Sequence, residues 1–437
     1  MFSDYFYPAQ RGVSQLCKSV SSIALVVLLS TGIHHAHAGH TLTFDQALHL
    51  AQERSRQLVA QEAVADTARN LAVAAGRLPD PTLQLGINNL PISGMDQFSI
   101  GRDFMTMRSY GVSQEFVRPE KRQARAARFE REAEGAEVGR ELALANLQRD
   151  TALAWLERYY QEAIRELLVR QRDEAKLQIN AAEAAYRSSR GAQVDVFIAR
   201  SAVAQIEDQI AQLDRQVAIA KTMLARWVGG IAETPLGEKP ATELAHLKDA
   251  DFNTGLNHHP VLAVLAKQEE VASADAEVAR ANKKTDWSVV MAYNQRGSIY
   301  SDMVTVGISI PLQWDQKNRQ DRELAARLAV VERVRAQREE AVRTHVAEVR
   351  SMLQEWQSNR ERFIRYDETL IPLARERTQA ALAAYRGGTG TLTAVLDARR
   401  NEITTRTERL RLELETARLW ARLNFQVPLE HSASAAH

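Results

Sequence analysis

The residues of this sequence that could do chemistry are few, and they form no catalytic motif. The chain lacks the spacings H-E-x-x-H, G-x-x-x-x-G-K-[S/T] and G-x-S-x-G, which hold zinc, phosphate and a nucleophilic serine in known enzymes. Its formal net charge is +1, which gives no bulk attraction for a nucleic acid. We therefore predict that the protein is not an enzyme, carries no cofactor and binds no nucleic acid.

Candidate metal ligands are methionines and one histidine pair. Thioethers suit soft metal ions, although methionine more often serves as apolar filler. Met105 and Met107 are the strongest of five methionines near the predicted strands, the others being Met95, Met291 and Met303. His258 and His259 have no third ligand near them in the sequence, so we predict a poor zinc site there.

The N-terminal segment has the pattern of a secretory signal peptide. Arg11 and Lys18 precede an apolar run, and Ala36-His37-Ala38 follows it as a cleavage site. We predict that residues 1–38 are removed. The only cysteine, Cys17, would leave with them, so neither a lipid anchor nor a disulfide is expected.

Two glycine-containing turns each join two long stretches of strong helix formers. The first turn lies near 186–193 and the second near 385–391. The helix before the first turn, about 120–185, would be about 100 Å long at 1.5 Å per residue. Apolar residues after this turn alternate at spacings of three and four, which predicts a coiled-coil seam: Val203, Ile206, Ile210, Leu213, Val217, Ala220 and Leu224.

The same order of elements occurs twice, which predicts an internal duplication. The first repeat spans 39–230 and begins with a helix that is expected to end near Arg77. A linker, 231–249, leads to the second repeat, 250–427, in which Pro372 should kink the long helix. Residues 428–437 form a polar tail that we expect to be disordered.

Each repeat also contains a pair of segments with period-two alternation, at 82–117 and 286–313. Apolar residues occupy one face and polar or small residues the other, which indicates strands. Their length suits an outer-membrane barrel wall that faces lipid. Four strands cannot close such a barrel, and open edges cannot lie in lipid. The chain is therefore expected to form an obligate oligomer.

The sequence resembles the TolC family of outer-membrane efflux channels over about 42–425. The resemblance rests on the tandem repeat and on the two turn motifs, 185–196 and 384–398. The second motif matches the family pattern Tyr-x-x-Gly-Thr…Val-Leu-Asp-Ala without a gap. Three further stretches are similar to the heavy-metal-resistance branch typified by CzcC: Leu78-Pro79-Asp80-Pro81, Asn88-Asn89-Leu90-Pro91 and Asp103-Phe104-Met105-Thr106-Met107-Arg108.

The resemblance implies an α+β membrane protein that assembles as a homotrimer. Long coiled-coil hairpins would form an α-barrel in the periplasm, and four strands per chain would share one 12-stranded β-barrel in the outer membrane of a Gram-negative bacterium. It further implies a periplasmic membrane-fusion adaptor and an inner-membrane pump of the RND type as partners, and heavy-metal cations as cargo. Adaptor contact is expected at the two turns, through Tyr186, Gly191, Tyr385, Gly387, Gly388 and Gly390.

The resemblance also points to Asp397 and Asp195 as gate residues, although each could instead cap or solvate a helix start. The family prototype has two acidic residues at its second-repeat constriction, whereas this chain has Ala394 and Asp397. One acidic ring is a weaker cation filter than two. The first turn has Ser189 where the family usually has glycine.

Two alternatives remain open at this point. Within the channel class, the cargo could be drugs or secreted protein. In a different class, the chain could be an exported periplasmic coiled-coil adaptor or scaffold that has no need for strands of membrane-crossing length.

Overall fold

The computed structural model describes residues 41–242 and 259–429. The predicted signal peptide, the end of the linker, the start of the second repeat and nearly all of the predicted tail lie outside these residues. Elements of the first repeat are α1 (Phe44–Arg54), α2 (Arg56–Ala75), β1 (Thr82–Asn88), β2 (Met107–Phe116), α3 (Pro119–Arg187), α4 (Gln193–Val228) and the 3₁₀ turn η1 (Gly229–Glu233). Elements of the second are α6 (Pro260–Asn282), β3 (Trp287–Gln295), β4 (Met303–Ser309), α7 (Gln320–Arg365), the π turn η3 (Tyr366–Leu370), α8 (Ile371–Arg386) and α9 (Leu392–Asn424).

The first predicted helix is in fact two helices. Thr43 and Gln46 form the expected capping box at the start of α1. At Ser55 the backbone becomes extended, and its hydroxyl oxygen accepts a bond from the Leu58 N–H at 3.3 Å. Ser55 thus ends α1 and caps α2, which is a favoured position for serine. The prediction of one continuous helix to Arg77 was wrong at this residue.

The four strands form one antiparallel sheet in the order β1-β2-β3-β4. Its register aligns apolar side chains across all four strands in one row, and all four are exposed, with between 49% and 67% of their surface accessible: Leu83, Val112, Met291 and Val306. The neighbouring row on the opposite face consists of small or polar residues: Gln84, Gly111, Ala292 and Thr305. The alternation predicted from the sequence is therefore confirmed as two faces of opposite character.

The long helices pair as hairpins. Helix α3 has 69 residues, starts just after β2 and ends at the first turn. It packs against α4 through the predicted seam, in which all residues are buried except the half-buried Val217. In the second repeat the hairpin is interrupted by η3, directly before Pro372. Proline lacks the N–H that a continuous α-helix needs, so the expected interruption is confirmed.

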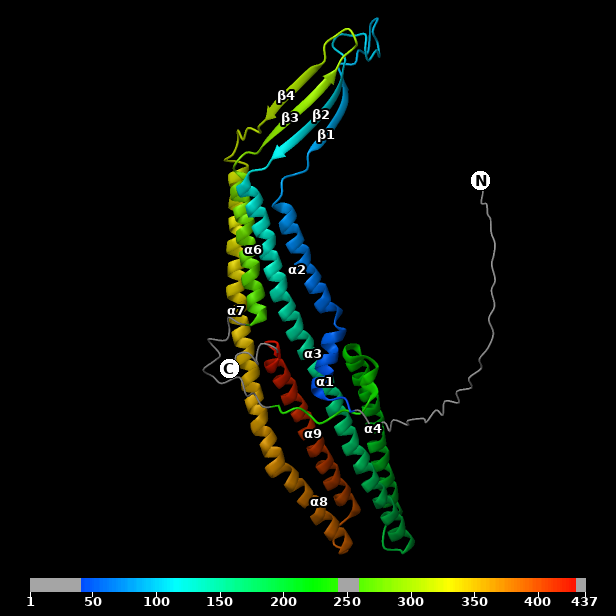
Figure 1. The fold of residues 1–437 in the computed structure, drawn as a ribbon. Coiled ribbons are helices and arrows are strands. Elements are labelled where there is room, and N and C mark those ends of the chain that lie inside the picture. The colour runs from blue at the N-terminus through cyan, green and yellow to red at the C-terminus, as the bar shows by residue number, and fades with distance from the viewer. Residues whose placement is uncertain (1–40, 243–258, 430–437) are drawn as a thin grey trace, which may run out of the picture. The chain divides into compact units, whose positions relative to one another are not determined.

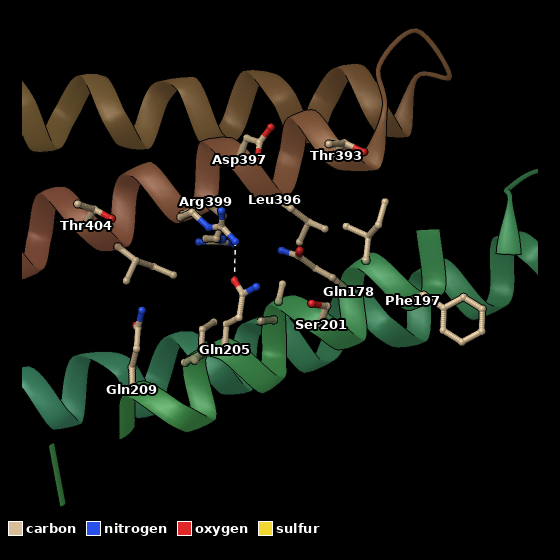
Figure 2. A pocket seen from close by; sticks show the side chains of 16 residues that line it. Gln178, Phe197, Ser201, Gln205, Gln209, Thr393, Leu396, Asp397, Arg399 and Thr404 are labelled. Carbon is tan, nitrogen blue, oxygen red and sulfur yellow. Dashed lines mark hydrogen bonds between the residues drawn. The ribbon is translucent and has the colours of Figure 1, made fainter. Parts of the chain in front are cut away.

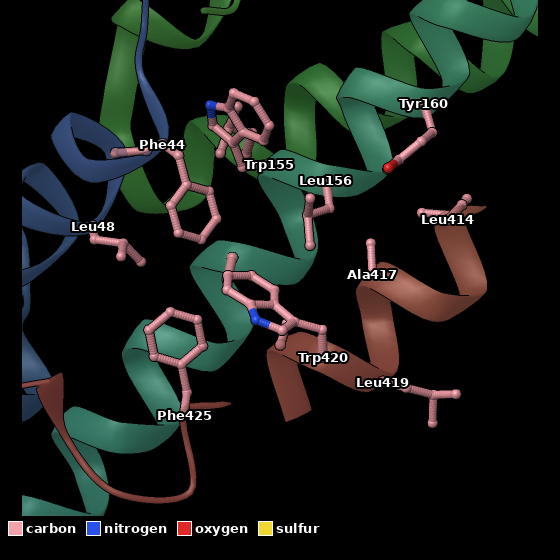
Figure 3. Close-up of a cluster of buried hydrophobic side chains, with 14 of the residues drawn as sticks. Phe44, Leu48, Trp155, Leu156, Tyr160, Leu414, Ala417, Leu419, Trp420 and Phe425 are labelled. Atoms are coloured by element: carbon pink, nitrogen blue, oxygen red, sulfur yellow. The ribbon is translucent and has the colours of Figure 1, made fainter. Parts of the chain in front are cut away.

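An aromatic cluster joins the beginning of the first repeat to the end of the second (Figure 3). The Phe44 ring packs edge-on against Trp155 with centroids 5.6 Å apart, and it contacts Trp420 at 5.8 Å. The Trp155 indole N–H donates to the Leu42 carbonyl at 3.2 Å. Such aromatic contacts add to the area that each ring buries, so the two repeats share one core.

A buried arginine fixes the chain segment that leaves α4. Arg158 of α3 is 1% exposed. Its guanidinium donates to the carbonyls of Ala232 and Thr234 and pairs with Glu162 at 2.8 Å. Because an arginine has five N–H donors in a rigid fork, one side chain satisfies both carbonyls at once and holds η1 against α3.

The start of α3 is tied to the start of β3. Asp286 accepts from the Arg118 backbone N–H at 3.0 Å and from the Lys121 ammonium at 2.7 Å. Burial opposes ionisation of this carboxyl group, but the two donors together hold its pKa below the ordinary value.

In the part of the chain that the structure describes, no helix is long and apolar enough to cross a membrane.

Candidate functional site

The two turns at the hairpin ends have the same backbone hydrogen bonds. In the first turn, the N–H groups of Arg190 and Gly191 both donate to the Ala185 carbonyl, at 2.9 and 3.1 Å. In the second turn, Thr389 and Gly390 donate to Ala384 in the same way, both at 3.0 Å. The duplication seen in the sequence therefore extends to individual bonds at both turns.

Glycine is needed in these turns for two different reasons. At Gly191 and Gly390, an added Cβ would lie 3.0 Å from the Cβ of Ala185 and Ala384, respectively. At Gly388 there is open space, but φ is +77°, a conformation that L side chains rarely adopt. The equivalent residue in the first turn is Ser189, with φ of +57°. The first turn thus carries backbone strain that the second avoids.

Adding a methyl group at Gly388 should therefore loosen the second turn. The left-handed conformation costs a non-glycine residue about 1 kcal/mol or more. For Gly388→Ala we expect roughly fivefold faster trypsin cleavage after Arg386, because transient opening of the turn becomes more populated. Gly387→Ala is the matched control, since Gly387 has an ordinary φ of −75°. Equal cleavage rates in the two variants would contradict the assignment of strain to position 388.

The two turn tyrosines have different surroundings. Tyr186 is 47% exposed. Tyr385 packs against a small cluster near the hairpin ends to which both hairpins contribute: Ala182, Val196, Ala199 and Leu392. The first tyrosine is therefore available to a partner, whereas the second helps to hold the hairpins of one chain together.

The two candidate gate aspartates also differ. Asp195 lies in the first turn of α4, and its carboxylate accepts from the Ala192 backbone N–H at 3.2 Å. This contact is a helix cap, as the alternative interpretation predicts. Asp397 is exposed in α9 and pairs with no cation among the described residues. Of the two, only Asp397 has a carboxylate that is not engaged in a cap.

Asp397 also lines a cavity of about 360 Å³ between the two hairpins (Figure 2). Residues of α3, α4 and α9 contribute to its wall, and Gln205 and Arg400 are joined across it by a hydrogen bond of 2.6 Å. The wall mixes apolar side chains such as Phe197 and Leu396 with amides, hydroxyls and guanidinium groups. Asp195 is not among the residues that line it.

The second repeat matches a known family. Residues 253–425 match the family described as Outer membrane efflux protein. The match covers most of the second repeat. This family consists of outer-membrane channels that act as passive conduits rather than as enzymes. The exposed apolar rows of the sheet argue against the alternative of a periplasmic scaffold, because soluble proteins rarely expose apolar patches of this kind.

Solved channels have the same fold. This chain superposes on CusC with a TM-score of 0.73 at 14% identity, covering 88% of this chain and 91% of that one. For VceC of Vibrio cholerae the TM-score is 0.72 at 17% identity, covering 88% and 95%. For CmeC of Campylobacter jejuni it is 0.73 at 12% identity, covering 88% and 85%. Comparison with curated proteins gave no significant match.

The candidate methionines that the structure describes do not converge on one site. Met291 belongs to the apolar face of the sheet, whereas Met107, the first residue of β2, pairs with Asn88, the last residue of β1. Met105 is exposed in the loop before β2. Within the described ranges, histidine, cysteine and acidic side chains also form no group of three or more that could hold a metal ion.

A row of charges between the two hairpins was not predicted from the sequence. Glu402 is only 3% exposed and pairs with Arg406 at 2.8 Å. Arg399 reaches Glu174 on α3 at 2.8 Å. The spacing 399, 402, 406 places all three charges on one face of a helix, so it could have indicated an internal ion-pair ladder. The role of Arg158 has no comparable signal, because its partners are backbone carbonyls far away in the sequence.

Proposed function

We propose that three copies of this chain assemble into a conduit that exports heavy-metal cations in a tripartite system. The observation that supports the trimer is the exposed apolar face of the sheet together with its two free edges. Among the described residues, β1 and β4 each pair on one side only. Unpaired strand edges and apolar rows are both satisfied when sheets join edge to edge within lipid. Three sheets of four strands make 12, an even number within the range of known barrels.

The cargo proposal is supported by three stretches of sequence that are similar to the CzcC branch. Two of them meet in the structure. The Asn89 side-chain amide donates to the Met105 carbonyl at 3.3 Å, and the buried Thr106 hydroxyl donates to the Asn89 carbonyl at 3.0 Å. Asp103 accepts from the N–H groups of Met105 and Thr106. These residues close the loop between β1 and β2, so the similarity marks loop architecture and supports the cargo only indirectly.

Growth of a deletion strain tests the cargo. The strain should become sensitive to zinc, cobalt, nickel or copper salts and keep its resistance to dyes and detergents, and a plasmid copy should restore growth. The Gly388→Asp variant should fail to restore growth while its trimer and its membrane level stay normal, because we propose that the turns contact the adaptor. Sensitivity to dyes alone would favour a drug channel, and loss of the trimer in Gly388→Asp would leave only a structural role for this glycine.

We further propose that Asp397 supplies one acidic ring at the periplasmic gate. Its carboxylate is exposed and not paired with a described cation, as a cation filter requires. Asp397→Asn should weaken block by divalent cations about tenfold in planar-bilayer conductance, since three charges are removed from the ring at once. Asp195→Asn is the matched control, because Asp195 is engaged as a cap. Unchanged block in Asp397→Asn would exclude this gate.

A further inference from the structure

Two histidines that are 86 positions apart in the sequence meet at the start of α6. His259 is the residue directly before α6, where its extended backbone is fixed by the following Pro260. His345 lies in α7. The Nε2 atom of His345 lies 3.1 Å from the Nδ1 atom of His259, and both side chains are partly buried. In the sequence His259 stands next to His258 alone, so its pairing with His345 becomes visible only in the folded chain.

The separation of the two nitrogens suits two ligands of one metal ion. With metal–nitrogen distances of about 2.0–2.1 Å, two tetrahedral ligands would lie about 3.3–3.4 Å apart, and two adjacent octahedral ligands about 2.9 Å apart. The observed 3.1 Å lies between these values. The ring planes are inclined by 72° with centroids 5.0 Å apart, so the rings do not stack against each other.

Binding of a metal ion requires an unprotonated nitrogen on each ring, because the neutral imidazole is the form that binds metals. In the present pair one ring donates a proton to the other. A bound ion would require each ring to keep its proton on the nitrogen that faces away, which needs only a change of tautomer and no net loss of protons.

We propose that His259 and His345 bind a divalent first-row transition-metal ion and thereby link the start of α6 to the middle of α7. Water would fill the remaining coordination positions, because the described residues contain no group of three or more histidine, cysteine or acidic side chains that could hold a metal ion. The expected order of affinity follows the general series, with Cu²⁺ above Ni²⁺ and Zn²⁺. This site does not depend on the proposed cargo, because a drug channel could contain it equally well.

The test is binding of Cu²⁺ to the untagged, detergent-purified protein. The wild type should bind one tight Cu²⁺ per chain, and its electron paramagnetic resonance spectrum should show coupling to two imidazole nitrogens. His345→Gln should reduce the affinity at least tenfold and remove one of the two couplings. Glutamine still offers an amide for hydrogen bonding, and an unchanged melting temperature without metal would show that the variant folds.

His49→Gln is the matched control, because His49 is an exposed residue of α1 and should not affect the bound ion. A second readout is the melting temperature, which Zn²⁺ should raise in the wild type and in His49→Gln but not in His345→Gln. Binding that is equally tight in His345→Gln, or a spectrum with no imidazole coupling, would overturn the proposal and leave the pair as a hydrogen bond only.

Discussion

Replacing Val306 with arginine is expected to remove most of the protein from the outer membrane. Val306 is 67% exposed and stands in the middle of β4, in the apolar row that crosses all four strands. An arginine at the lipid-facing midplane of a barrel costs about 2–4 kcal/mol, and each trimer would carry three of them. The measurement is the amount of heat-modifiable trimer in the outer-membrane fraction, which should fall at least tenfold.

The control for this variant is the next residue along the strand. Gly307 has its side-chain position on the opposite face, and an added Cβ would meet no atom within 4 Å. Gly307→Arg should therefore assemble nearly as well as the wild type, since the inner face of a channel is wet. If both variants assembled normally, the apolar rows would not face lipid.

Removing the guanidinium of Arg158 should be the most damaging change in the helical part of the chain. Arg158→Met leaves two carbonyls, those of Ala232 and Thr234, without the donors that they have in the structure. An unsatisfied buried polar group costs about 1–3 kcal/mol, so we expect a loss of about 3 kcal/mol per chain. The apparent melting temperature of the purified trimer should fall by several degrees.

Arg170→Met is the matched control on the same helix. The side chain of Arg170 is 67% exposed, and among the described residues it forms an ion pair with Glu166 at 3.5 Å, a kind of pair that contributes little. The melting temperature of Arg170→Met should stay within about one degree of the wild type, which corresponds to a loss of at most a few tenths of a kcal/mol in the free energy of unfolding. A fall of equal size in both variants would show that the carbonyl contacts of Arg158 are not what stabilises the chain.

Elements set by local patterns could be predicted from the sequence. Two apolar patterns predicted which face of their element is apolar, and the structure confirms both. They are the seam from Val203 to Leu224 and the alternation of Val304, Val306 and Ile308. The break at Ser55 was missed, although serine is a good cap, because the helical pattern continues on both sides of it. A single capping hydrogen bond changes the path of the backbone without changing the periodicity.

Long-range contacts could not be predicted in this way. Arg158 looks like any charged residue of a long helix, and only the folded chain places it under the carbonyls after α4. Likewise His345 lies alone in α7, and its meeting with His259 depends on how α6 packs on α7. The turns could be predicted in part. Their glycines could be recognised in the sequence, but the strain at Ser189 becomes visible only from its positive φ angle.

The inner face of the sheet has a consequence for selectivity. Gln84, Gly111, Ala292 and Thr305 line up there as an amide, a bare backbone, a methyl group and a hydroxyl. In the trimer that we propose, this row would favour neither sign of charge and would hold no particular solute. Selection of molecules would then occur before they enter the barrel, and this row would limit only their diameter.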